Sequence, residues 1–117
     1  GPNSECWVLL DRNRLKQVRM NFLTNAVKCT KSGYIKMGYG IERKGLRIYV
    51  EDTGIGIPDD LHDKVFTRFE KLNEFSQGTG LGLTISRAIV EAAGGEVGFT
   101  SKLGVGSTFW AWLPLRP

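Results

Sequence analysis

The sequence predicts an α/β (α+β) two-layer sandwich, in which a mixed, mostly antiparallel sheet of about five strands carries three helices on one face. Three observations support this prediction. The chain has 117 residues, which suits one compact domain. Its hydrophobic content of 41% and charged content of 24% are ordinary for a globular protein. The predicted strands form two hairpins separated by helical segments, which favours antiparallel pairing over a doubly wound parallel sheet.

Residues 5–117 are predicted to form a single domain, because no internal repeat or linker interrupts them. Residues 1–4 (Gly-Pro-Asn-Ser) look like a remnant of cloning and are set aside. No apolar run approaches the roughly 20 residues of a membrane helix, and no signal peptide is visible. The net charge of +4 comes from scattered basic residues, which does not indicate a nucleic-acid surface. Cys6 and Cys29 lack metal spacing and are expected to be reduced thiols.

The first half of the chain is predicted to contain a strand, a long helix and a β-hairpin. The apolar run 6–10 is predicted as a strand, and Asp11 as the N-cap of a helix over Arg12–Cys29. Residues 34–41 and 46–52 are predicted as strands, joined by a turn with a glycine near its end. The apolar face expected on the helix comprises Leu15, Val18, Phe22, Leu23, Ala26 and Val27.

The second half is predicted to contain two further helical segments and a second hairpin. Residues 59–63 are predicted as a short helical turn after Pro58, and residues 70–77 as a loop. A helix is expected from Gly78 to about residue 93, where two glycines end it. Residues 96–100 and 107–113 are predicted as the last two strands. The apolar positions expected on this second helix are Leu81, Ile85, Ala88, Ile89 and Ala92.

A polar stripe on the long helix is the first candidate site. At about 100° per residue, Arg14, Asn21, Asn25 and Lys28 fall within a sector roughly 60° wide. Asparagine is a poor helix former, so two of them one turn apart favour a polar ligand about as much as a solvated face. Their carbonyl oxygens could bind Mg²⁺, and Lys28 could neutralise phosphate charge.

Two glycine-containing segments complete the pattern. Asp52-x-Gly54-x-Gly56 follows a strand, and its acid can accept a hydrogen bond from an amino group, although the same pattern occurs in plain turns. Residues 78–82 (Gly-x-Gly-x-Gly) open a helix, where free amides and the helix dipole favour an anion. Neither a Rossmann nor a P-loop pattern fits these glycines. Together with the asparagines, the segments predict an ATP·Mg²⁺ pocket with its adenine end at Asp52.

Four segments in this order resemble the N, G1, F and G2 boxes of sensor histidine kinases. They are residues 21–28 (NFLTNAVK), 52–58 (DTGIGIP), 65–69 (VFTRF) and 78–83 (GTGLGL). Residues 104–109 (GVGSTF) also resemble the closing strand of that family. The resemblance extends from residue 6 onward. It implies the Bergerat ATP-binding fold, which gyrase, heat-shock chaperone and mismatch-repair ATPases share.

The resemblance also implies a role for each matching residue. Asn25 would bind Mg²⁺ with Asn21 beside the phosphates, and Lys28 would contact phosphate or ribose. Asp52 would bind the adenine amine, with Thr108 supporting Asp52 through water, and residues 70–77 would form a short lid over ATP. The remaining ATP-binding positions that it implies are Gly54, Gly56, Ile57, Phe69, Lys71, Gly78, Thr79, Gly80, Leu81, Gly82 and Leu83.

Two positions depart from the family pattern. Cys29 stands where the family often has an aromatic residue over adenine, which puts base stacking there in doubt. Lys71 stands where an arginine commonly reaches the phosphates. Lysine keeps the charge of that arginine but loses its bidentate fork.

Asn21 distinguishes two subfamilies. The ATPases of the superfamily carry a glutamate there as general base, and an amide cannot take a proton near neutral pH. Asn21 therefore favours phosphoryl transfer, with Asn21, Asn25 and Lys28 as the catalytic residues of a protein-histidine kinase. The family's acceptor histidine lies on a separate dimerisation domain. The one histidine here, His62, matches no acceptor motif and is expected at the surface. The chain is thus expected to bind ATP without phosphorylating itself.

The expected partners are ATP, the histidine-bearing dimerisation domain of the parent kinase, and the receiver domain of a response regulator. The fragment is expected to be a cytoplasmic monomer without direct membrane contact, from a parent that could be membrane-anchored. Two alternatives on the same fold stay open, namely an ATP-binding regulatory module without transfer activity and an anti-sigma-type serine kinase. Nucleic-acid binding, suggested by the basic pI alone, is a distant fourth.

Overall fold

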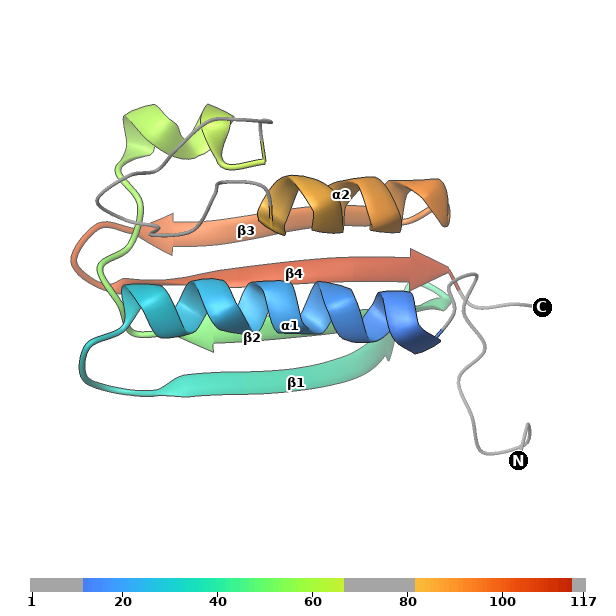
Figure 1. The fold of residues 1–117 in the computed structure, drawn as a ribbon, viewed down its shortest axis with the longest axis horizontal. Helices are drawn as coiled ribbons and strands as arrows, with labels where there is room; N and C mark the ends of the chain where they lie inside the picture. The colour runs from blue at the N-terminus through green and yellow to red at the C-terminus, as the bar shows by residue number, and fades with distance from the viewer. Residues whose placement is uncertain (1–11, 67–81, 115–117) are drawn as a thin grey trace.

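The computed structural model describes residues 12–66 and 82–114, and Figure 1 shows that these form two layers. Both α-helices lie across the same face of the sheet (Figure 1), as the sandwich prediction requires. None of the helices in these ranges is long and apolar enough to cross a membrane. The elements in chain order are α1 (Arg12–Cys29), β1 (Ile35–Glu42), β2 (Gly45–Asp52), the 3₁₀ helix η2 (Asp59–Lys64), α2 (Gly82–Ala92), β3 (Glu96–Lys102) and β4 (Gly106–Pro114).

The sheet has the strand order β1-β2-β4-β3, and each neighbouring pair is antiparallel. The two predicted hairpins are therefore confirmed. The described residues contribute four strands, against about five predicted, and the remaining predicted strand, residues 6–10, lies outside them. β2 and β4 form the centre of the sheet. Their register brings Asp52, at the end of β2, opposite Ser107, near the start of β4.

The core lies between the central strands and α1. Alternate residues of β2 and β4 are buried beneath the helices, as expected for strands with one covered face. From α1, Val18, Phe22 and Ala26 are at most 1% exposed. The predicted apolar face of α1 is wider than the buried face in the structure, because the predicted member Val27 is 57% exposed. The buried face thus follows one stripe of α1, which leaves the polar stripe accessible.

α2 buries a different face from the one that its apolar residues predicted. Leu83, Ser86 and Val90 are buried, whereas the predicted position Ile85 is 40% exposed. Ser86 explains the error, since counting apolar residues excludes it from the core. In the structure its hydroxyl accepts a hydrogen bond from Asn21 Nδ2 at 3.0 Å, which satisfies a polar atom in a buried place.

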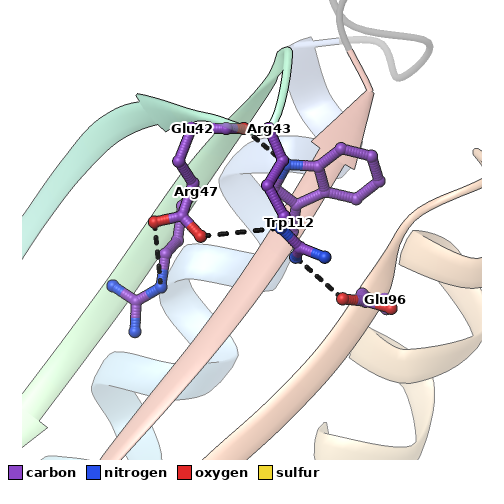
Figure 2. Close-up of polar contacts among 5 residues, drawn as sticks. All are labelled: Glu42, Arg43, Arg47, Glu96 and Trp112. Atoms are coloured by element: carbon purple, nitrogen blue, oxygen red, sulfur yellow. Dashed lines mark hydrogen bonds and ion pairs between the residues drawn. The ribbon is translucent and has the colours of Figure 1, made fainter.

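The open face of the sheet carries aromatic and charged side chains in place of helices. Trp112 lies over Gly45, where a Cβ would collide with the indole ring. The Arg43 guanidinium lies 4.8 Å from the centroid of that ring and bonds Glu96 at 2.8 Å, as Figure 2 shows. Gly45 therefore makes room for Trp112. The hairpin turn itself is formed by Arg43 and Lys44, which adopt positive φ angles of 50° and 58°.

His62 is more enclosed than the surface position that the sequence predicted. Its side chain is 31% exposed, and its Nε2 lies 3.0 Å from the carbonyl oxygen of Ile57, to which it donates. Its ring meets Phe99 edge-on, at 5.0 Å between centroids. Phe66 contacts the same Phe99 ring, as expected for a core aromatic, while Phe69 lies outside the described residues. His62 therefore fastens η2 to the sheet.

Candidate functional site

Asp52 ends β2 and is a buried residue, with 4% of its surface exposed. Its Oδ1 accepts a hydrogen bond from the backbone N–H of Gly54 at 2.8 Å. Burial raises the pKa of the carboxyl, while hydrogen bonds from the N–H groups of Gly54 and Ser107 and the nearby Thr30 hydroxyl oppose that rise. Thr30 Oγ1 is buried and makes no hydrogen bond of good geometry within the described ranges. A strong acceptor and a buried hydroxyl thus lie together at the end of β2, in a place where a polar ligand could bond to both.

The turn after Asp52 needs its glycines because it packs against backbone. A Cβ on Gly54 would collide with the carbonyl oxygen of Cys29 and would stand 2.9 Å from Asp52 Oδ1. Gly56 has a φ of 74°, and a Cβ there would collide with the backbone of β3. The N–H of Ile55 donates to the Cys29 carbonyl at 3.2 Å. The turn is therefore seated on the C-terminal end of α1.

The far end of the turn is attached to the β3–β4 hairpin. The N–H of Ile57 donates to Ser101 Oγ at 2.8 Å, and the N–H of Gly104 donates to the carbonyl of Ile55 at 2.7 Å. The side chain of Ile57 belongs to the core, with 4% of its surface exposed. In the structure, Ile57 therefore contributes to the candidate site by anchoring the turn.

The polar stripe of α1 runs between the Asp52 turn and the start of α2. Asn21 Nδ2 donates to the carbonyl of Gly82 at 3.1 Å and to Ser86. Asn25 is half-buried one turn further on, and Lys28 is exposed in the last turn. From Asn21 to Cys29 the helix rises about 12 Å, a span that suits an extended nucleotide. One helix thus connects both ends of the candidate site.

Cys29 lies where that helix meets the turn. The thiol is half-buried, and burial, together with the negative charge of Asp52, raises its pKa to about 11. The charge of Lys28 opposes this rise. The thiol is therefore neutral near physiological pH and presents a small apolar surface beside Asp52.

The position predicted for Thr108 does not fit the strand register. Thr108 pairs with Glu51, and Ser107 pairs with Asp52. Because side chains alternate along a strand, Thr108 points to the open face of the sheet, away from the Asp52 carboxylate. Ser107, which is 8% exposed, shares the covered face with Asp52. Counting two residues back from the core residue Phe109 would have identified Ser107.

Two hollows differ in their relation to these residues. One, of about 470 Å³, lies between α1 and the β1–β2 hairpin and touches none of the predicted site residues. We therefore do not assign it to the candidate site. The other, of about 340 Å³, adjoins Asp52 and Ser107 at the strand ends and reaches Thr108 on the open face. The predicted site residues that lie outside the described ranges are Phe69, Lys71, Gly78, Thr79, Gly80 and Leu81.

The donor set of the site suits a phosphate-bound cation better than a metal held by the protein alone. The described residues contain no group of three or more His, Cys, Asp or Glu side chains that could hold a metal. Asn25 offers an amide oxygen on the accessible stripe of α1. Mg²⁺ commonly takes one or two protein ligands and completes its shell with phosphate oxygens and water.

Comparison with known proteins gives a consistent set of matches. Residues 10–117 match the family model of histidine kinase-, DNA gyrase B- and HSP90-like ATPases. The sensory/regulatory protein RpfC of Xanthomonas campestris pv. campestris is 41% identical over 115 residues, which cover 90% of this chain and 16% of RpfC. The crystal structure of full-length ShkA in complex with AMPPNP has a TM-score of 0.82 and 36% identity, and the match covers 91% of this chain and 22% of that one.

An isolated domain gives a more even match in length. The nucleotide-free catalytic domain of the histidine kinase ThkA has a TM-score of 0.77 and 36% identity, and the match covers 90% of this chain and 68% of that one. By contrast, this chain spans only a small part of RpfC and of full-length ShkA.

Proposed function

This chain belongs to the family of histidine kinase-, DNA gyrase B- and HSP90-like ATPases, and we propose that it is the catalytic, ATP-binding domain of a sensor histidine kinase. In this proposal it binds ATP with Mg²⁺ in the cytoplasm and acts on a histidine of a separate dimerisation domain. A receiver domain then takes the phosphoryl group from that histidine. The four ordered motifs and the similarity to the ThkA catalytic domain support the proposal.

The buried carboxylate of Asp52 is the observation that carries the proposal. Its Oδ1 is oriented by the Gly54 N–H, and burial raises its pKa. A carboxylate can only accept hydrogen bonds. Adenine carries an exocyclic amino group at C6, whereas guanine and hypoxanthine carry a carbonyl oxygen at that position. Asp52 is thus suited to select adenine nucleotides.

The phosphate end supports transfer to an acceptor more than hydrolysis. Asn21 directs its amide nitrogen toward the Gly82 carbonyl and Ser86, and its side chain has no basic atom to activate water. In the proposal, Asn25 binds Mg²⁺ and Lys28 balances phosphate charge. The acceptor imidazole forms an N–P bond to the γ-phosphorus as the O–P bond to ADP breaks, and its proton passes to solvent.

Transfer in trans tests the proposal. The chain is mixed with the histidine-bearing helices of its parent protein and ATP labelled on the γ-phosphate, with and without Mg²⁺. We expect Mg²⁺-dependent labelling of the helices with an acid-labile, base-stable phosphate. Acid-stable phosphate would indicate a serine kinase. Unimpaired ATP binding without any labelling would indicate a regulatory module.

A further inference from the structure

Ser101 was not predicted as a site residue, yet it is the side chain to which the end of the Asp52 turn is attached. It lies in β3 and accepts the N–H of Ile57 at 2.8 Å. The same hydroxyl lies 3.1 Å from the carbonyl oxygen of Gly106 and 2.7 Å from Ser107 Oγ. One hydroxyl therefore joins the turn to both strands of the β3–β4 hairpin.

The direction of these hydrogen bonds follows from counting protons. A serine hydroxyl has one proton and two lone pairs. The Ile57 N–H can only donate, and the Gly106 carbonyl can only accept. All three contacts are satisfied together when Ser101 donates to Gly106 and accepts from both Ile57 and Ser107. The arrangement thereby fixes the hydroxyl of Ser107 as well.

Ser107 links this arrangement to the base-recognising carboxylate. It pairs with Asp52 across the sheet, and its backbone N–H bonds the Asp52 carboxylate. Ser101 therefore holds the far end of the turn and, through Ser107, the strand that supports Asp52. A water molecule in place of the Ser101 hydroxyl would have to order itself between several backbone groups, with a loss of entropy.

We propose that Ser101 is a positioning residue for base recognition, whose hydroxyl holds the turn so that Asp52 faces the exocyclic amine. This inference rests on the proposed binding of adenine nucleotides. It predicts that loss of the hydroxyl relaxes discrimination between bases. A residue that served stability alone would weaken the binding of all nucleotides equally.

The first test compares Mg²⁺·ADP with Mg²⁺·IDP, which differ at the group that Asp52 would recognise. Ser101→Ala should weaken ADP binding about tenfold in calorimetry and change IDP binding less than about twofold. Ser101→Thr, which keeps a hydroxyl, should restore the ratio of ADP affinity to IDP affinity. Thr100→Ala is the matched control, since Thr100 is its exposed neighbour and pairs with Thr108. Equal weakening of both nucleotides, or an unchanged ratio, would overturn the proposal.

The second test follows backbone amides and needs no nucleotide. In Ser101→Ala, hydrogen exchange at the Ile57 amide should accelerate, while exchange at the Ile55 amide, which bonds Cys29, should not change. Unchanged exchange at the Ile57 amide would show that the Ser101 hydroxyl does not hold the turn. If the alanine variant does not fold, Ser101→Cys, with its weakly bonding thiol, carries both tests. If the unaltered chain binds neither nucleotide, the proposed function fails. The exchange result still shows whether the Ser101 hydroxyl holds the end of the turn.

Discussion

The base end and the phosphate end of the candidate site are built in different ways. At the base end, Asp52 and its turn are held mainly by backbone groups, of the turn itself, the end of α1 and the β3–β4 hairpin, together with the Ser101 hydroxyl. At the phosphate end, the predicted ligands Asn21, Asn25 and Lys28 are side chains along one stripe of α1. The base end is therefore fixed by folding. The phosphate end depends on side-chain rotamers, and its predicted glycines lie largely outside the described residues.

The largest effect is expected from neutralising the carboxylate at the base end. Asp52→Asn keeps an oxygen for the Gly54 N–H but replaces a charged acceptor with a neutral amide. Hydrogen bonds to charged groups contribute about 1.5–3 kcal/mol, so ADP affinity should fall up to about 100-fold. IDP affinity should fall less, because the amide can donate to a carbonyl oxygen. Calorimetry with both nucleotides measures the difference.

Glu51→Gln is the matched control for that prediction. Glu51 is adjacent in the chain, lies on the open face and bonds the Tyr34 hydroxyl at 2.9 Å. This variant should change ADP affinity by less than about twofold, as expected for a partly exposed position on the opposite face of the sheet from the Asp52 carboxylate. An Asp52→Asn variant that binds ADP as well as its control does would contradict the assignment of the base end.

At the phosphate end, Asn25→Ala should affect binding only when the metal is present. Removal of one Mg²⁺ ligand should weaken Mg²⁺·ADP binding about tenfold, whereas metal-free ADP binding should change little. Titrations in Mg²⁺ and in EDTA measure the two values. Thr24→Ala, an exposed neighbour on α1, is the control. An equal loss with and without Mg²⁺ would mean that Asn25 supports the fold and does not bind the ion.

The raised pKa of Asp52 gives the base end its own pH dependence. Because the charged form accepts the amine, ADP binding should weaken about tenfold per pH unit below the folded pKa, which exceeds the unperturbed value of about 3.9. The sign for stability is opposite. A raised pKa means that the folded state prefers the protonated acid, so protonation of Asp52 favours folding.

Binding and unfolding measured over the same acid range distinguish these two effects. Asp52→Asn should remove both the acid loss of affinity and the Asp52 contribution to the pH dependence of stability. If ADP binding and the free energy of unfolding instead fall together in both proteins, acid unfolding and not Asp52 titration explains the loss.

The sequence was sufficient for the elements whose signals are local. The bounds of α1 agree with the prediction, which relied on a 3.6-residue apolar period and on Asp11 as N-cap, although Asp11 itself lies outside the described residues. Both hairpins followed from runs of strand-forming residues around short turns. The Asp52 turn was recognised because its glycines are needed where backbone approaches backbone, and this requirement is visible in the sequence.

The errors concern contacts between distant segments. Ser86 is a core residue because Asn21 of another helix satisfies its hydroxyl. His62, predicted at the surface, is partly covered because Phe99 of β3 packs on it. Thr108 was chosen in place of Ser107, and a shift of one residue in a strand exchanges the two faces of the sheet. Ser101 belongs to no motif in the prediction, because its role depends on the turn that rests on it.

The smallest effect on binding is expected from Asn21, which joins the phosphate end to α2. Asn21→Ala removes two hydrogen bonds, to Gly82 and Ser86, and neutral bonds contribute about 1 kcal/mol each. The free energy of unfolding in urea should therefore fall by about 1–2 kcal/mol. ADP affinity should fall less than in Asn25→Ala, because the Asn21 amide nitrogen faces α2. A double-mutant cycle with Ser86→Ala should give a coupling of about 0.5–1.5 kcal/mol. Strict additivity, with a loss of affinity as large as that of Asn25→Ala, would mean that Asn21 binds the nucleotide or its metal directly. Asn21, which bonds α2, and Asn25 would then play the same part in the polar stripe of α1.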